Sequence, residues 1–266
     1  MRYQKPISNP WTHYWEEELF GFWSDIQRLK DRFSLPISSL FNRIILANSL
    51  KRMIDIFGAL VGIILSSPVW LVIPLLIKID SPGPVLYSQQ RVGKDRRKGD
   101  RRKSSNDVLE RRSSTRRLFS GFGKPFNIIK FRTMCQDAES KSGPVWATKQ
   151  DARITKIGKF MRKTRIDEIP QLFNILKGDM SLVGPRPERQ FFIEQLLDQI
   201  DNYDYRLKVK PGLTGLAQVE HKYDESLEDV NTKVDYDLKY IREWNLIKDI
   251  KIILKTVIVV VTAKGM

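Results

Sequence analysis

Two adjacent carboxylates, Asp167 and Glu168, are the side chains in this sequence best suited to chemistry. Three cations, Arg162, Lys163 and Arg165, lie just upstream of them. Adjacent side chains on a helix point about 100° apart, so we expect the two carboxylates to have different roles rather than to share one proton. An aspartate beside cations can attack phosphorus as a nucleophile or hold a magnesium ion, which makes Asp167 a candidate for either task.

The same segment also has a purely structural interpretation. Thr164 and Asp167 have the spacing of a capping box, although Glu or Gln is usual at the last position. Asp167 can also serve as the N-cap of a following helix, with Pro170 tolerated in the first turn. This segment alone is therefore compatible with catalysis and with helix capping.

Other basic residues are suited to holding phosphate. The alternating pattern around Lys130 and Arg132 predicts a short strand with both side chains on one face, where two cations can hold a diphosphate. The alternative for these two residues is an exposed basic strand face. Arg186 lies between Pro185 and Pro187, which fix the backbone on both sides and present a rigid guanidinium suited to phosphate.

The charge balance of the chain favours anionic partners. The formal net charge is +15, which suits nucleic acid, phospholipid headgroups or phosphorylated substrates. Residues 94–117 contain 11 Lys and Arg and 4 Asp and Glu, and their low hydrophobicity predicts a flexible loop. Electrostatic attachment to anionic lipid and a solvated loop both fit this stretch. Its charges are not interleaved with aromatic residues, which argues against nucleic acid as a partner.

Cysteine and histidine contribute little to the functional reading. The single cysteine, Cys135, cannot form a disulfide within the chain and fits a reducing compartment. His13 and His221 lie far apart in sequence, so a structural zinc site is not expected.

One long apolar segment predicts membrane insertion. Residues 56–77 contain no charged side chain, and about 20 apolar residues suffice to span a bilayer as a helix. Ser66, Ser67 and Pro68 lie near the centre of this run, and Pro74 follows. Proline removes a helix hydrogen bond, whereas serine hydroxyls can satisfy the carbonyls that are freed. We therefore expect at least a kink at Ser67-Pro68.

The charges that flank this run distinguish two membrane topologies. Positive charge marks the cytoplasmic side of a membrane segment, and here it is found at both ends. A hairpin that enters one leaflet and returns is the hypothesis we favour, and a kinked single span is the alternative. The flanking cations are Arg43, Lys51 and Arg52 before the run and Lys78, Arg91 and Lys94 after it.

Two further segments have helical patterns. Residues 11–33 repeat apolar side chains at helical spacing and include Trp11, Trp15 and Trp23, which predicts an amphipathic helix. Its tryptophans favour contact with a membrane interface or a partner, and packing on the protein's own core is the alternative. Residues 246–263 are interrupted by lysines, and their uninterrupted apolar part is too short to span a bilayer. They predict a core helix or an interfacial helix.

Taken together, these stretches resemble the bacterial sugar transferases, the family of monotopic phosphoglycosyl transferases. The resemblance runs from about Lys51 to the C-terminus, apart from the basic insertion. The segments that carry it are the apolar run with Ser67-Pro68, SPGPVLYSQQRVG, FNIIKFRTM, RIDEIPQLFNILKGDMSLVGPRPE and KPGLTGLAQV.

The resemblance implies a fold, a location and a reaction. The fold is a predominantly helical α+β domain with a small β element, held by a re-entrant hairpin at the cytoplasmic face of the bacterial inner membrane. The reaction transfers a sugar-1-phosphate from a UDP-sugar to polyprenyl (undecaprenyl) phosphate and releases UMP, as the first membrane step of a surface glycan. Membrane lipid is the further partner, and a homodimer is compatible with the resemblance.

The resemblance also implies roles for single residues. Asp167 matches the family's nucleophile, which forms a covalent phosphosugar intermediate. Glu168 matches its partner carboxylate, the second catalytic residue, which acts as a proton acceptor or belongs to the metal site. A magnesium ion, with Asp167 as a candidate ligand, would offset the charge of the diphosphate. The matching positions that hold phosphate or shape the site are Lys130, Arg132, Arg162, Arg186 and Gln218.

The sequence departs from the family pattern after Gln218. The family commonly shows Asn-Gly-Arg two residues later, whereas here Lys222 ends the corresponding tripeptide and keeps the cation without the bidentate fork. We divide the chain into an aromatic amphipathic extension, 1–50, and a phosphoglycosyl transferase domain, 51–266. That domain contains the hairpin at 51–80 and the basic loop insertion at 94–122. A membrane-anchored assembly protein without enzymatic activity is the alternative from another class.

Overall fold

The computed structural model describes residues 37–95, 123–136, 138, 151–221 and 227–262. The chain divides into two compact units, Met1–Lys51 and Arg52–Met266. The described part of the first unit is the start of helix α2 (Ile37–Leu65). The predicted amphipathic helix at 11–33 and nearly all of the basic stretch at 94–117 lie outside the described residues.

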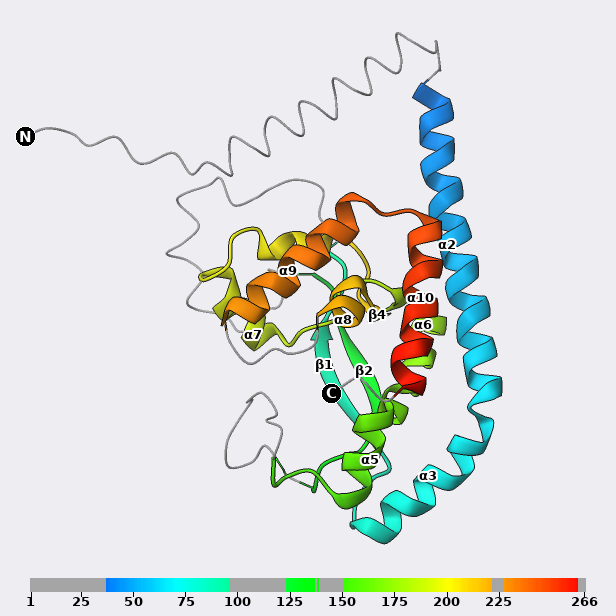
Figure 1. The fold of residues 1–266 in the computed structure, drawn as a ribbon, viewed down its shortest axis with the longest axis vertical. Coiled ribbons are helices and arrows are strands. Elements are labelled where there is room, and N and C mark those ends of the chain that lie inside the picture. The colour runs from blue at the N-terminus through cyan, green and yellow to red at the C-terminus, as the bar shows by residue number, and fades with distance from the viewer. Residues whose placement is uncertain (1–36, 96–122, 137, 139–150, 222–226, 263–266) are drawn as a thin grey trace, which may run out of the picture. The chain divides into compact units, whose positions relative to one another are not determined.

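The described part of the second unit combines two small sheets with a larger set of helices (Figure 1). Strands β1 (Leu86–Val92) and β2 (Pro125–Phe131) pair antiparallel along their whole length. Strands β3 (Ser181–Val183) and β4 (Gly212–Thr214) form a short parallel pair. The strand predicted around Lys130 is therefore confirmed, and so is the predominantly helical α+β class.

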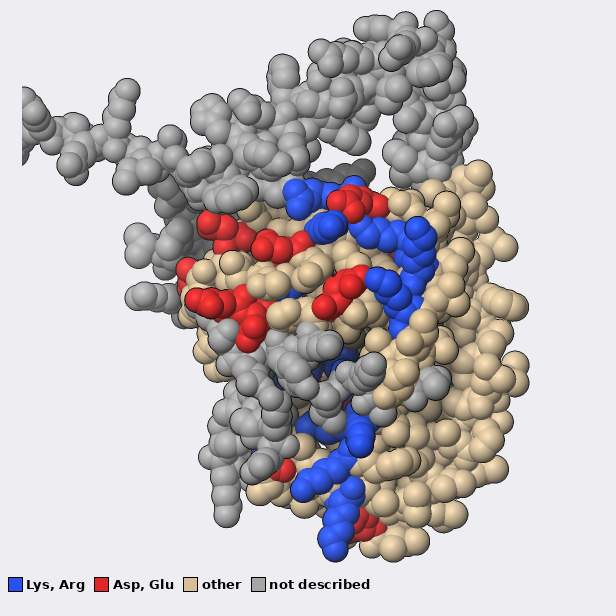
Figure 2. Space-filling model, in the orientation of Figure 1, with Lys and Arg blue, Asp and Glu red and all other residues tan. Residues whose placement is uncertain are grey.

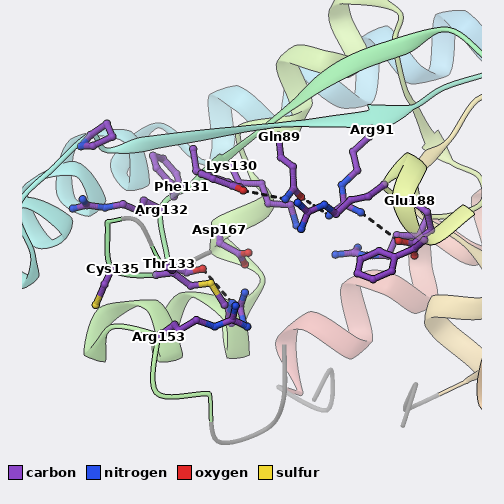
Figure 3. A pocket seen from close by; sticks show the side chains of 18 of the residues that line it. Gln89, Arg91, Lys130, Phe131, Arg132, Thr133, Cys135, Arg153, Asp167 and Glu188 are labelled. Carbon is purple, nitrogen blue, oxygen red and sulfur yellow. Dashed lines mark hydrogen bonds and ion pairs between the residues drawn. The ribbon is translucent and has the colours of Figure 1, made fainter. Parts of the chain in front are cut away.

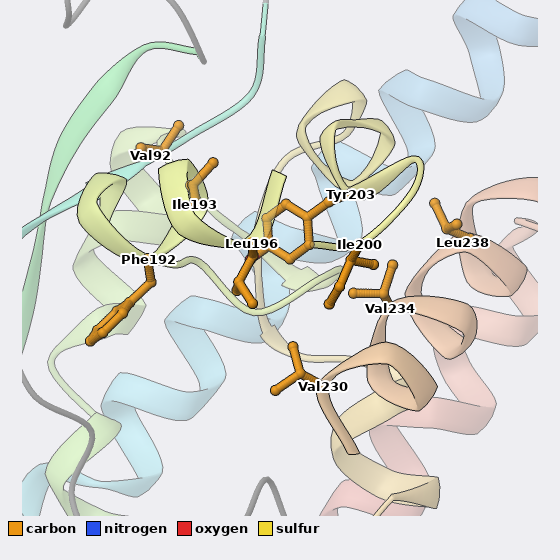
Figure 4. Close-up of a cluster of buried hydrophobic side chains, with 9 residues drawn as sticks. All are labelled: Val92, Phe192, Ile193, Leu196, Ile200, Tyr203, Val230, Val234 and Leu238. Carbon is orange, nitrogen blue, oxygen red and sulfur yellow. The ribbon is translucent and has the colours of Figure 1, made fainter. Parts of the chain in front are cut away.

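The remaining helices pack around these strands through buried apolar side chains. One such cluster fixes three helical elements against the end of β1 and is shown in Figure 4. Its members are Val92, Phe192, Ile193, Leu196, Ile200, Tyr203, Val230, Val234 and Leu238. The helices are α5 (Lys156–Thr164), α6 (Gln171–Lys177), α7 (Gln190–Leu197), α8 (Leu216–Glu220), α9 (Leu227–Arg242) and α10 (Leu246–Val261), with 3₁₀ helices η3 (Ile166–Glu168) and η4 (Tyr203–Lys208).

Helix α10 has one buried side and one exposed apolar side. Ile252 is buried in a cluster with Val183 and Tyr240, so part of the helix belongs to the core. Ile247 and Leu254 are 66% and 60% exposed. The interpretation as a core helix is therefore confirmed for the buried side, and the interpretation as an interfacial helix stays a prediction for the exposed side.

The predicted break in the apolar segment lies between α2 and α3 (Ser67–Asp80), as Figure 1 shows. Ser66 Oγ donates to the carbonyl of Ile63 at 3.2 Å and accepts from Trp70 Nε1 at 3.2 Å. Pro68 lies in the first turn of α3, where a missing N–H costs little. The hydroxyl of Ser66 thus binds a carbonyl in the last turn of α2, although the carbonyl that would pair with residue 68 in a continuous helix is that of Ile64.

The bent pair presents apolar side chains on its outer surface. Among the described residues, no single helix is long and apolar enough to cross a membrane, whereas α2 from Leu46 and α3 pass that test together, bent by 60°. In Figure 2 charged side chains gather over other helices, and the edge along the junction of α2 and α3 shows none. The most exposed apolar side chains of the pair include Phe57, Ile64, Leu65, Leu71, Leu75 and Ile79.

Buried polar contacts attach both helices of the pair to the domain. In α2, Asp55 Oδ1 accepts from Ser181 Oγ and from the backbone N–H of Leu182, both at 2.9 Å. At the end of α3, Asp80 Oδ2 accepts from the backbone N–H of Ile157 in the first turn of α5, at 3.0 Å. The two attachments fix the helix pair to β3 and to α5.

The C-terminal end of α6 is held by α2 as well. Arg52 donates to the carbonyl oxygens of Ile175 and Leu176, at 2.7 and 2.8 Å. These carbonyls belong to the last turn of a helix, where backbone donors are scarce, and that of Ile175 also accepts from the N–H of Gly178 at 3.0 Å. The chain then leaves the helix through Gly178, whose φ of 92° lies in the left-handed region that favours glycine.

We expect Asp55→Ala to destabilise the domain. Asp55 is only 4% exposed, and its removal leaves two buried donors unsatisfied, at a cost of roughly 1–3 kcal/mol. Thermal unfolding in detergent would measure the loss as a lower midpoint. Asp55→Asn, which keeps an acceptor oxygen, should lose less, and the exposed Asp235→Ala should lose little. Equal midpoints for all three variants and the wild type would contradict this role.

Candidate active site

A cavity of about 770 Å³ brings most of the predicted site residues together (Figure 3). Its walls come from β1 and β2, the segment after β2, α5, η3, the turn after β3, α7, η4 and α9. Five residues predicted from sequence line it, namely Lys130, Arg132, Arg162, Asp167 and Arg186. Four of the predicted cations therefore share one cavity with the candidate nucleophile.

A short irregular turn places Asp167 at this cavity. Helix α5 ends at Arg165, whose φ of 59° is left-handed, and the chain then forms the 3₁₀ helix Ile166–Glu168. The capping interpretation is wrong, because Thr164 Oγ1 donates back to the carbonyl of Phe160 at 2.9 Å. The N-cap of α6 is Pro170, without a side-chain cap.

Asp167 is buried and incompletely satisfied. The residue is only 6% exposed. The Oδ1 atom of its carboxylate has no hydrogen-bond partner among the described residues. Burial, followed by the charge of Glu168, raises the pKa of Asp167 to about 6, although Lys130 and Arg162 oppose the shift. Such a carboxylate is poorly solvated when ionised, which favours its attack on an electrophile that enters the cavity.

The pKa of Glu168 is shifted in the opposite direction from that of Asp167, because two cations contact its carboxylate. Its Oε1 forms ion pairs with Lys130 Nζ, at 2.9 Å, and with Arg186, whose Nη1 also lies 3.4 Å from Oε2. Burial raises the pKa of Glu168, but the charges of Arg186 and Lys130 outweigh burial and hold that pKa well below its usual range. The expectation of different roles for the two carboxylates agrees with these opposite shifts.

The two cations paired with Glu168 respond differently to that contact. Burial lowers the pKa of Lys130, even though Glu168 opposes the shift. The charge of Glu168 raises the pKa of Arg186 against the effect of burial, so this guanidinium stays charged.

The alternative of an exposed basic strand face is wrong, because the side chain of Lys130 is 18% exposed and Arg132 is buried.

Arg132 and Arg162 each donate hydrogen bonds to nearby groups of the protein. Arg132 donates to the carbonyl oxygens of Ser81 and Pro82, the Ser81 contact being 2.7 Å, so its guanidinium joins the end of α3 to the end of β2. Arg162 Nε donates to Thr133 Oγ1 at 3.1 Å. Arg132 therefore shapes the site from the hairpin side, while Arg162 contributes charge beside Asp167.

Gln218, which the sequence predicts to bind phosphate, is not brought into this cavity. Gln218 is not one of its lining residues, and its Nε2 donates to the carbonyl of Leu213 at 3.1 Å. Lys222 lies outside the described residues.

Several cavity residues escaped the sequence analysis. Glu188 follows Arg186 by two positions, inside a motif that had been noted, but no role had been assigned to it. Arg206 and Lys233 come from η4 and α9, and no local pattern marks them. Arg206 forms a buried ion pair with Asp237 at 2.8 Å, a contact that only tertiary packing creates.

The donor set at Asp167 fits a magnesium ion that is held mainly by a substrate. Within the described residues no group of three or more His, Cys, Asp or Glu could hold a metal by itself. Asp167 Oδ1 is a carboxylate oxygen without a partner, whereas the oxygens of Glu168 are engaged by cations. Magnesium is commonly bound by one or two carboxylates together with substrate phosphates and water, and one carboxylate is available here.

A buried carboxylate pair in a cationic cavity, carried by a largely helical α+β domain, defines a site suited to phosphate chemistry. The chain belongs to the bacterial sugar transferase family, whose family model matches residues 46–103 and 110–263. The family expected from the sequence motifs is therefore confirmed.

Curated relatives extend this similarity to named proteins. The chain is 41% identical over 216 residues to a UDP-N-acetylgalactosamine-undecaprenyl-phosphate N-acetylgalactosaminephosphotransferase of Aeromonas hydrophila, which covers 81% of this chain and 44% of the relative. It is 38% identical over 234 residues to a UDP-glucose:undecaprenyl-phosphate glucose-1-phosphate transferase of Escherichia coli K12, covering 86% and 44%. An undecaprenyl-phosphate galactose phosphotransferase of Salmonella typhimurium is 36% identical over 230 residues, covering 81% and 41%. The chain thus spans less than half the length of these relatives, whose names differ in the sugar.

We expect Asp167→Asn to stabilise the fold near neutral pH. The carboxyl of native Asp167, with a pKa of about 6 against an ordinary value of 3.8, keeps its proton to higher pH than the same group in the unfolded chain. The native state therefore binds more protons in this window, and the wild type loses stability as the pH rises through it. The variant should gain up to about 3 kcal/mol at pH 8 and almost nothing at pH 4.

Unfolding midpoints of both proteins in detergent across this pH range would measure the difference. The exposed Asp235→Asn makes the same chemical change and should show no comparable pH dependence. A variant that is less stable than the wild type at pH 8 would contradict the raised pKa of Asp167.

Proposed function

We propose that this protein transfers a sugar-1-phosphate from a UDP-sugar to polyprenyl (undecaprenyl) phosphate and releases UMP, which initiates a surface glycan. The observation that carries the proposal is the buried, unpartnered carboxylate oxygen of Asp167 in a cavity lined by Lys130, Arg162 and Arg186. The names of the relatives, which specify undecaprenyl phosphate and sugar phosphotransferase activity, support the same reaction. Because those names differ in the sugar, the proposal extends to the substrate class only.

The reaction proceeds in two displacements at one phosphorus atom. In the first, an oxygen of ionised Asp167 forms a bond to the sugar-linked phosphorus, and the bond from that phosphorus to the bridging oxygen breaks. UMP leaves with the electron pair of the broken bond, and the sugar phosphate stays on the aspartate as an acyl phosphate. In the second, a phosphate oxygen of the lipid attacks the same phosphorus, and Asp167 leaves as a free carboxylate. Two steps allow a soluble and a lipid substrate to use one site in turn.

Glu168 positions the cations that such displacements require. A carboxylate that holds Lys130 and Arg186 fixes both groups beside Asp167 before the substrate arrives. Preorganised positive charge lowers the cost of bringing a diphosphate next to a negatively charged nucleophile. We therefore propose Glu168 as a positioning residue, and Arg162 as a further cation facing Asp167.

We propose magnesium as the cofactor, with Asp167 as the protein ligand beside the diphosphate of the donor. When bound, the ion would neutralise charge on the diphosphate and stabilise the UMP leaving group. Lys130 and Arg186 would continue to orient the phosphate groups.

We also propose that the bent pair is a re-entrant hairpin in one leaflet, with the domain on the cytoplasmic face of the inner membrane. Asp55 in α2 and Asp80 at the end of α3 both bind the same domain. A straight crossing would place Asp55 and Asp80 on opposite sides of the membrane, although both contact that one domain. A hairpin avoids this, leaves the exposed apolar side chains near Leu65 and Leu71 in lipid, and keeps both flanking sets of cations on one side.

The activity is tested by UMP release from UDP-sugars in the presence of polyprenyl phosphate and magnesium. We expect the wild type to release UMP and Asp167→Asn to lose at least about a thousandfold in rate, because the amide is a poor nucleophile. Asp235→Asn, on the exposed side of α9, should keep the wild-type rate. Equal release by the wild type and Asp167→Asn would exclude Asp167 as nucleophile. No release with any UDP-sugar would favour the non-enzymatic assembly protein.

The topology is tested by labelling introduced cysteines with a membrane-impermeant reagent. The exposed native Cys135 is first replaced by Ser, and single cysteines are then placed at the exposed Ser49 and Ser88. These positions precede and follow the bent pair. A hairpin predicts that both are labelled from the cytoplasmic side only. Labelling from opposite sides would establish a kinked span instead.

A further inference from the structure

Part of the cavity wall lies away from Asp167 and has no role in the proposed phosphate transfer. This region differs from the one around Asp167 because it combines an apolar wall with a carboxylate. We call it the Glu188 subsite. Its residues are Gln89, Arg91, Glu188, Phe192, Leu196, Tyr203, Val230 and Lys233.

Three successive carbonyl groups fix the turn that carries Glu188. The carbonyl of Arg186 accepts from Arg206 at 3.2 Å, that of Pro187 from Arg91 at 3.2 Å, and that of Glu188 from the backbone N–H of Val92 at 3.1 Å. The contacts come from η4 and from β1, so the backbone is restrained from two directions. Glu188 therefore has a fixed position in the cavity wall, as preorganised binding requires.

The carboxylate of Glu188 keeps capacity to accept hydrogen bonds. Its Oε2 lies 3.3 Å from Arg91 Nη1, and its Oε1 lies 3.6 Å from Lys233 Nζ. Both contacts are longer than the 2.9 Å contact between Lys130 and Glu168. Burial raises the pKa of Glu188, but Lys233 and Arg91 outweigh it and lower the pKa overall, so the group is an ionised acceptor. An acceptor in a cavity wall selects a ligand that offers O–H or N–H donors.

An apolar wall accompanies this acceptor. Phe192 and Leu196 of α7 and Val230 of α9 belong to the buried cluster of Figure 4 and also line the cavity. Such a wall suits the flat face of an aromatic heterocycle better than a ring that carries hydroxyls all round. Heterocycle and hydroxyl donors occur together in a nucleoside.

The position of the subsite matches the covalent order of a nucleoside diphosphate sugar. Arg186 and Glu188 lie on either side of Pro187, one directed to Glu168 and the other lining the subsite. Figure 3 shows Glu188 and Arg91 on one side of the cavity and Asp167 with Thr133 and Arg153 on the other. A donor whose diphosphate lies beside Asp167 can thus extend its nucleoside toward Glu188.

We propose that the Glu188 subsite binds the nucleoside of the donor substrate, with Glu188 accepting a hydrogen bond from a ribose hydroxyl and Phe192 and Val230 contacting the base. This proposal rests on the proposed function, since it assumes a UDP-sugar donor. A sugar hydroxyl offers the same donor chemistry as a ribose hydroxyl, so the test must separate these two sources.

The test measures binding of UMP and of 2′,3′-dideoxyuridine monophosphate to the purified full chain in detergent, by calorimetry. The wild type should bind UMP roughly tenfold to a hundredfold more tightly, because the analogue lacks the ribose hydroxyls that would donate a hydrogen bond to the charged carboxylate of Glu188. Glu188→Gln should lose most of this preference. Glu194→Gln, a substitution of the same kind in α7 at a residue that does not line the cavity, should retain it.

Two results would overturn the proposal. Equal binding of the two nucleotides by the wild type would do so without any variant, so a Glu188→Gln protein that fails to fold does not weaken the test. A Glu188→Gln protein that binds UMP normally but no longer distinguishes UDP-sugar from UDP would assign the carboxylate to the sugar. Either result would leave Asp167-dependent UMP release intact, whereas loss of that release with normal UMP binding would refute the proposed function.

Discussion

The ion pairs of Glu168 with Lys130 and Arg186 are the contacts on which the site depends. They join three segments that are distant in sequence, the end of β2, the turn η3 and the turn after β3. The charges of Arg186 and Lys130 hold the pKa of Glu168 well below its usual range, whereas burial, followed by the charge of Glu168, raises the pKa of the adjacent Asp167. A buried charge without partners is costly, so the same arrangement that stabilises Glu168 leaves Asp167 poised to react with an incoming group.

The rest of the fold connects this arrangement to the bent pair of helices α2 and α3. Asn174 in α6 accepts from the backbone N–H of Ile129 and donates to the carbonyl of Asn127, which fixes β2 against that helix. Arg52 in turn binds the end of α6, and Arg132 joins β2 to the end of α3. The strand that presents Lys130 is thus held by contacts with both helices of the bent pair, directly or through α6. In the proposed hairpin arrangement, this connection keeps the site at a constant position relative to the two helices of the bent pair.

Much of this arrangement follows from local sequence patterns, and the exceptions have a physical cause. The break at Ser66-Ser67-Pro68 and the strand around Lys130 depend on neighbouring residues, so both could be predicted. The capping interpretation is wrong because the hydroxyl of Thr164 donates to a carbonyl of its own helix. Arg165 ends α5 in a left-handed conformation, and the 3₁₀ turn that follows places Asp167 at the cavity. The Glu188 subsite could not be predicted, since Arg91 and Lys233 reach Glu188 only after β1 and α9 have packed.

The covalent intermediate on Asp167 is the central claim, and mass spectrometry tests it most directly. The protein is incubated with a UDP-sugar and magnesium, without lipid acceptor, then quenched and digested. A covalent intermediate predicts a mass increase equal to one sugar phosphate on the peptide that contains Asp167, which disappears when polyprenyl phosphate is added before quenching. UMP release in the presence of acceptor, without any such adduct at Asp167 under rapid quenching, would contradict the account and indicate direct transfer between the substrates.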